Sequence, residues 1–90
     1  SRLSFQEKRK LTNRRKSLSE RYDLLHNEEE ELSRKIEQAQ LKMGLYVTNY
    51  EKLQEFQAII ESSEEKILAL LEEKENLERE LEELDNLLGD

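Results

Sequence analysis

The stretch LQEFQAIIESSEEKILALLEEKENLERELEELDNLL, residues 53–88, decides the fold of this chain. Apolar side chains recur in it at alternating spacings of three and four residues, so that every seventh position repeats. This heptad pattern is typical of helices that bury a narrow stripe, the seam, against another helix. Only two seam positions are polar, and such residues usually set the register or the oligomeric state. The seam residues of this stretch are Leu53, Phe56, Ile60, Ser63, Ile67, Leu70, Lys74, Leu77, Leu81, Leu84 and Leu88.

The same seven-residue period continues upstream, although with more polar residues in the seam. The upstream repeat is interrupted on its second stripe by Lys8, Arg15 and Glu29. We therefore predict one coiled-coil segment over residues 4–88, with a weaker, basic half (4–50) and a strong, acidic half (51–88). The second apolar stripe changes side between the halves, which is the mark of a stutter in a coiled coil. The upstream repeat consists of Leu11, Leu18, Leu25, Leu32, Ala39 and Tyr46.

Composition agrees with an all-α coiled coil. Of the 90 residues, 34% are hydrophobic and 41% are charged, with no Pro and two Gly. This balance is too polar for an ordinary globular core, but it suits long helices that bury one stripe. No cysteine is present, which excludes disulfides and thiol chemistry.

Gly44 is the position at which the predicted helix is most open to interruption. The seven-residue period crosses it without a change of phase, so we expect one continuous helix, about 130 Å long at 1.5 Å per residue. The alternative is a helical hairpin that turns near Gly44. In that case Gly44 would end the first helix, and Thr48 with Glu51 would form the capping box of the second.

The charge distribution favours antiparallel pairing. Residues 1–22 carry eight basic and two acidic side chains, whereas the rest of the chain has a net charge of −13. Parallel pairing would place basic against basic and acidic against acidic residues. Antiparallel pairing brings Lys8 to Lys16 opposite the glutamates between residues 76 and 84, in a dimer as well as in a hairpin.

These patterns predict a structural role. We expect an oligomerisation or spacer segment of a larger scaffold or cytoskeletal protein, which pairs with itself or with another coiled-coil protein. We expect it inside the cell, in the cytoplasm or on the cytoskeleton, with a nuclear location also open. The predicted oligomer interface is the apolar seam together with Lys74. No signature motif points to a particular protein family.

Particular residues support two alternative hypotheses of function. A helical-hairpin module could dock a partner on Tyr46 and Tyr50, since aromatic side chains often anchor interfaces. Alternatively, a basic N-terminal arm could bind an acidic surface and be released by phosphorylation of Ser17, which follows two arginines as in a basophilic kinase site. The candidate basic patch consists of Lys8, Arg9, Lys10, Arg14, Arg15 and Lys16.

The sequence lacks the residues that several other classes of function require. Asn13 and Arg21 have the spacing of a basic zipper, but Glu31 stands where its first leucine belongs, which argues against sequence-specific DNA binding. The single histidine, His26, has no cysteine or second histidine with which to hold a structural metal. No nucleophile–base set and no glycine-rich phosphate loop is present, so we predict no enzyme, cofactor or small-molecule substrate. No apolar run reaches membrane-spanning length, so we predict no membrane partner.

Overall fold

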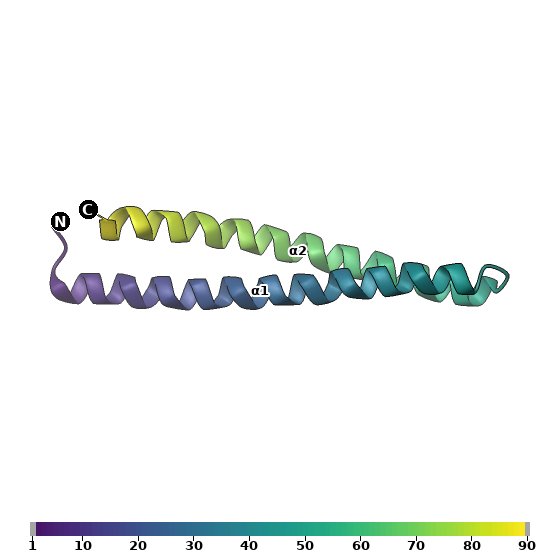
Figure 1. Ribbon diagram of the computed structural model, residues 1–90. Helices are drawn as coiled ribbons and strands as arrows, with labels where there is room; N and C mark the ends of the chain where they lie inside the picture. Colours follow the sequence, from purple (N-terminus) through teal and green to yellow (C-terminus); the bar gives the residue numbers. More distant parts are fainter. Residues whose placement is uncertain (1, 90) are drawn as a thin grey trace. The chain divides into compact units, whose positions relative to one another are not determined.

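The computed structural model describes residues 2–89, which form two long α-helices joined by a short turn (Figure 1). Helix α1 spans Phe5–Leu45 and contains 41 residues. Helix α2 spans Tyr50–Gly89 and contains 40 residues. Within the described residues there is no strand. The predicted all-α class is therefore confirmed.

The single continuous helix that we expected is wrong, and the hairpin alternative is the one observed. The helix stops at Leu45, and the Asn49 N–H closes the turn by donating to the Tyr46 carbonyl oxygen at 2.9 Å. Gly44 is not the turn residue, because it lies inside α1 and has no positive φ. Folding back buries the seams of the two helices against each other within one chain. A continuous helix would need a second chain, with the added entropic cost of association.

The caps of the helices explain where each one begins. The Ser4 hydroxyl accepts the Glu7 N–H at 3.1 Å, directly before α1. Before α2, the Asn49 side-chain oxygen accepts the Lys52 N–H at 3.1 Å. The predicted cap at Thr48 is thus wrong by one residue. Asparagine is preferred over threonine at N-cap positions.

The chain divides into two compact units, each of which contains part of both helices. The terminal unit comprises the described residues up to His26 and from Glu72 onwards. Its ion pairs run from Arg14 to Glu80 and from Arg21 to Glu73, so the two helix segments are antiparallel. Its buried residues are Leu18, Leu25, Lys74, Leu77 and Leu84.

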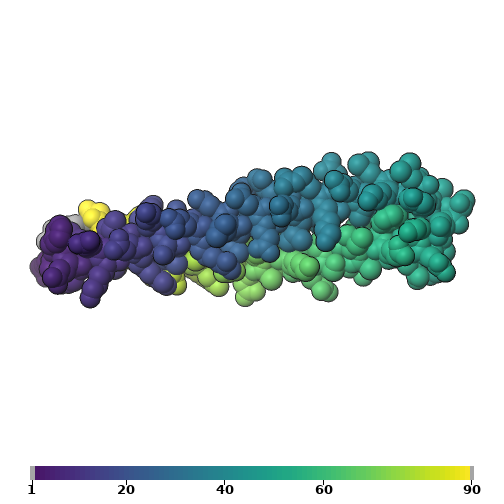
Figure 2. Space-filling model, turned by 90° about the horizontal axis from the view of Figure 1, so that it is seen from below, coloured from purple at the N-terminus to yellow at the C-terminus, as the bar shows by residue number. Residues whose placement is uncertain are grey.

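The turn unit spans Asn27–Leu71 and contains the end of α1, the turn and the start of α2. In the space-filling view, the side chains of its two helix segments lie against each other (Figure 2). Next to the turn, the rings of Tyr46 and Phe56 lie 5.7 Å apart between centroids, at an angle of 41°. Its buried residues are Leu32, Ala39, Ile60, Ser63 and Leu70.

Candidate interaction surfaces

The predicted seam forms the core of both units. Heptad spacing turns one stripe of each helix towards its partner, which removes these apolar side chains from water. Ser63 and Lys74, the two polar members, are buried like their neighbours. The residues predicted as an oligomer interface are therefore buried or half-buried within one chain. Of that set, Leu18, Leu25, Leu32, Ile60, Leu70, Lys74, Leu77 and Leu84 are buried, and Leu11, Leu53, Phe56, Ile67, Leu81 and Leu88 are half-buried.

Lys74 is a buried charged residue in the terminal unit, with 8% of its surface exposed. Its ammonium lies 5.0 Å from the centroid of the Tyr22 ring, within the range of a cation–π contact. The same Nζ lies 3.2 Å from Nδ1 of His26, which accepts the hydrogen bond if the ring is neutral and carries its proton on Nε2. These contacts suit one register of α1 against α2, because sliding either helix would leave a charge in an apolar seam.

Tyr22 extends the polar cluster to the edge of the seam. Its hydroxyl donates to Oε1 of Glu78 at 2.8 Å. The hydrogen bond to this carboxylate, followed by burial, raises the pKa of Tyr22 above its ordinary value. The cluster therefore joins both helices through a chain of contacts from Glu78 through Tyr22 to Lys74 and His26.

Ion pairs flank the seam of the terminal unit and match the predicted antiparallel charge pattern. Arg14 contacts Glu80 at 3.2 Å, and Arg21 contacts Glu73 at 3.1 Å. Each pair is largely exposed, so each adds well under ~1 kcal/mol, but together they select orientation.

The third of these ion pairs joins Arg15 to Asp85. Nη2 of Arg15 also donates to Oδ2 of Asp85 at 3.4 Å, beside the shorter contact through Nε. The hydrogen bond to Arg15 lowers the pKa of Asp85, and that to Asp85 raises the pKa of Arg15. The pair is two-pronged, which gives it more geometric specificity than a single contact.

The structure splits the candidate basic patch into two groups. Arg14 and Arg15 are engaged by carboxylates of α2. The other four residues are exposed along α1 and form no ion pair with any residue between positions 2 and 89. Carboxylates of the chain itself thus occupy two residues of the basic arm that an external acidic partner would otherwise bind. The four exposed residues are Lys8, Arg9, Lys10 and Lys16.

Ser17, the candidate phosphosite, is exposed on α1. On a helix, residues three before and four after share its face, and here these are Arg14 and Arg21. Both arginines form ion pairs with α2, through Glu80 and Glu73. A negative charge at Ser17 would therefore compete with those carboxylates for the same two guanidinium groups.

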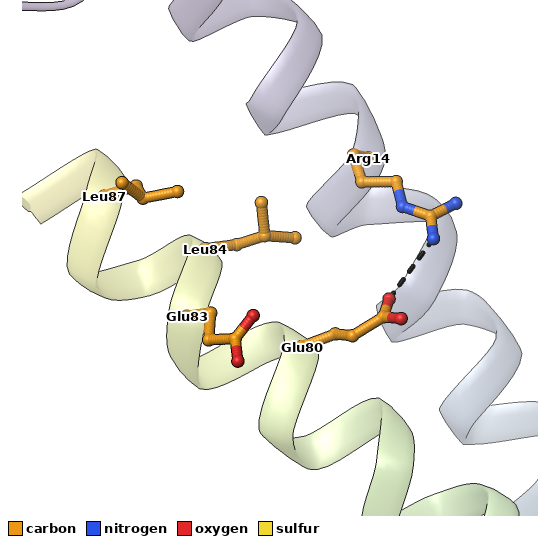
Figure 3. Close-up of a pocket in the computed structure, with 5 residues that line it drawn as sticks. All are labelled: Arg14, Glu80, Glu83, Leu84 and Leu87. Carbon is orange, nitrogen blue, oxygen red and sulfur yellow. Dashed lines mark hydrogen bonds and ion pairs between the residues drawn. The ribbon is translucent and has the colours of Figure 1, made fainter.

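The hollows in the surface are open to solvent, and the lining of the one between the helix ends mixes polar and apolar groups. One of about 250 Å³ lies between α1 and the end of α2 in the terminal unit, and Figure 3 shows Arg14 reaching across it to Glu80. Leu84 and Leu87 supply its apolar wall. The ion pair between Arg14 and Glu80 spans this hollow, so the one cation in its lining is already matched by a carboxylate of α2.

The exposed apolar side chains around the turn form a distinct feature, which we call the turn ridge: Leu45, Tyr46, Val47 and Tyr50. Their exposed fractions are 79%, 41%, 68% and 72%, respectively. The predicted docking residues Tyr46 and Tyr50 thus lie at the surface, one on each side of the turn. Four large apolar residues within six positions are a concentrated exposure for a chain that buries its seam.

Residues 2–89 contain no cluster of three or more His, Cys, Asp or Glu side chains that could hold a metal ion. Over the same residues, neither helix combines the length and the apolar character that crossing a bilayer requires.

Sequence reasoning predicted which residues the seam covers, but it missed individual contacts. Residue type favoured Asn49 over Thr48 as the cap of α2, although both types occur at N-caps. The pairing of Lys74 with Tyr22 and His26 could not be predicted, because it depends on which turn of α1 lies opposite Lys74.

Comparisons with protein families, with characterised proteins and with solved structures find no match to this chain.

Proposed function

We propose that this chain is a non-catalytic interaction and spacer segment of a larger scaffold or cytoskeletal protein, and that it contacts its partner through the turn ridge. The observation that carries the proposal is where the apolar side chains lie. The seam is covered within the chain, whereas the turn ridge is exposed. Aromatic side chains on a rigid support are typical anchors of protein interfaces.

The paired helices suit the role of a support. Each helix has about 40 residues, and ion pairs and the Lys74 cluster hold the terminal unit in one register. In the turn unit, the contact of Tyr46 with Phe56 holds the turn against α2. A partner that docks on the turn ridge would therefore meet side chains with restricted freedom, which reduces the entropy lost on binding.

Site-specific photocrosslinking in cells tests this proposal. A photoreactive phenylalanine analogue replaces Val47 in the turn ridge, and the matched control carries it at Leu24, which is 61% exposed on α1. We expect a discrete adduct with a second polypeptide from position 47 but not from position 24. The adduct should disappear when Tyr46→Ser and Tyr50→Ser are added. Equal adducts from both positions, or none from position 47, would overturn the proposal.

A second candidate, the basic arm, is supported by the exposed group of Lys8, Arg9, Lys10 and Lys16. It would grip an acidic polymer or an acidic protein tail, with binding that falls as salt concentration rises. Replacing these four residues by glutamine and measuring affinity for heparin and for polyglutamate at two salt concentrations separates it from the first proposal. Unchanged affinity would remove the arm as a candidate.

A further inference from the structure

The turn ridge carries residues that continue the seam from one helix into the other. Met43, Tyr46, Tyr50 and Leu53 follow one another at spacings of three, four and three residues. This alternation places side chains on one stripe of a helix. Met43 and Leu53 are half-buried, whereas Tyr46 and Tyr50 are exposed because the chain turns between them. A continuous helix through this region would bring both tyrosines into the seam.

Nothing in the turn prevents it from becoming helical. Positive φ angles are absent from the described residues, so no residue of the turn is held in the left-handed conformation that side chains disfavour. The chain has no proline, and Gly44 is already helical. The turn is held by the Asn49 N–H bond to Tyr46 and by the Asn49 cap on Lys52. A helix would replace these with its regular ladder of backbone bonds.

We infer that two copies of this chain exchange helices through the turn, so that α1 of each copy pairs with α2 of the other and Tyr46 and Tyr50 enter a continuous antiparallel seam. This inference rests on the proposed function, since it names a second copy as the partner of the turn ridge. Such exchange of identical elements is a low-cost route to dimers, because the contacts made are those of the closed chain.

Charge and polarity identify the second copy as the fitting partner. A helix that replaces α2 must place acidic residues where Glu73 and Glu80 meet Arg21 and Arg14. It must also place a cation between Tyr22 and His26, as Lys74 does. The α2 helix of another copy satisfies every one of these conditions, and the antiparallel order is the same in both arrangements. A partner with a uniform apolar seam would leave the cluster without its cation.

Spin-label distance measurement on the full chain tests this exchange. The native chain has no cysteine, so labels at Lys16→Cys and Glu82→Cys, both exposed in the terminal unit, report without interference. The labels lie on neighbouring helix segments in the closed chain. In the exchanged dimer, the labels of one chain would be about 100 Å apart, at 1.5 Å per residue.

The labelled chain is denatured, mixed with a ten-fold excess of unlabelled chain, refolded at high concentration and separated by size. We expect a dimer fraction in which the short distance is lost, beside a monomer fraction that keeps it. A dimer that retains the short distance consists of closed hairpins side by side and overturns the exchange. A chain that stays monomeric at millimolar concentration also overturns it.

Two matched pairs of substitutions in the turn sharpen the test. Val47→Ala with Thr48→Ala raises helix propensity and should lower the dimer dissociation constant about ten-fold. Val47→Asn with Thr48→Gly favours a turn and should raise it by a similar factor. Circular dichroism of both pairs checks that the helices persist. If the chain is monomeric and crosslinking from position 47 still reaches a different polypeptide, the exchange falls and the proposed function stands.

Discussion

The terminal unit and the turn unit pair the same two helices by different means. In the terminal unit, α1 and α2 are joined by ion pairs from three arginines and by the buried cluster around Lys74. In the turn unit, the buried seam joins the helices, Tyr46 contacts Phe56 beside the turn, and an ion pair between Lys52 and Glu55 lies within α2. Near the turn, the short connection itself holds the helices together. In the terminal unit, which is far from the turn in sequence, ion pairs and the polar cluster must set the register of α1 against α2.

Removal of a seam leucine is the largest perturbation that we expect. Leu25→Ala, at a residue that is 1% exposed, should lower the free energy of unfolding by about 3 kcal/mol, because it deletes apolar contacts and leaves a cavity. Leu24→Ala is the matched control, because Leu24 lies next to Leu25 but is 61% exposed. Urea denaturation followed by circular dichroism measures both. Similar losses for the two variants would contradict the assignment of the seam.

Charge reversal separates the two units. Arg21→Glu places two carboxylates opposite each other, because Arg21 contacts Glu73 at 3.1 Å, and should cost about 1 kcal/mol. Lys52→Glu in the turn unit disturbs a pair within one helix and should cost less. The compensating change Glu73→Arg should restore the Arg21→Glu variant. If it does not restore stability at low salt, the pair does not select orientation.

A charge at Ser17 is a milder way to weaken the terminal unit. Ser17→Glu should lower the free energy of unfolding by roughly 0.5 kcal/mol relative to Ser17→Gln, because the new carboxylate competes for Arg14 and Arg21. A phosphate, with about two charges, should act in the same direction and more strongly. Denaturation at low and at high salt measures the difference, which should vanish at about 1 M salt. A more stable Ser17→Glu variant would show that the local pairs on α1 outweigh the loss.

The smallest effect that we expect is the pH dependence contributed by Asp85. Arg15 lowers the pKa of Asp85 in the folded chain, so this pair contributes stability above the unfolded pKa of about 3.9. That contribution is lost as pH falls from there through the lower folded pKa. Asp85→Asn should therefore weaken the fall in the free energy of unfolding below about pH 4. It should leave the pH dependence of that free energy near neutral pH unchanged. Thermal melts between pH 2 and 7 measure this; an unchanged acid limb would contradict the assignment.

Much of this arrangement could be predicted from particular residues. The heptad positions from Leu53 to Leu88 predicted the buried stripe of α2, including the polar members Ser63 and Lys74. The charge contrast predicted antiparallel pairing. The break was misjudged because the period from Ala39 through Tyr46 to Leu53 crosses it in phase, and periodicity alone does not distinguish a turn from a helix. The cap was misplaced because Thr48 and Asn49 are both acceptable residue types.

The sequence by itself determined that the chain forms helices, which stripe of each is buried, and that opposite charges favour antiparallel order, since these follow from spacing and charge alone. Only the tertiary structure decided that the helices pair within one chain, that Asn49 begins α2, and that Lys74 lies between Tyr22 and His26. The reason is physical. The position of the loop and the register of α1 against α2 depend on two opposing terms. These are the free energy gained by packing the two helices and the entropy lost on closing the loop between them, and no local pattern encodes their balance.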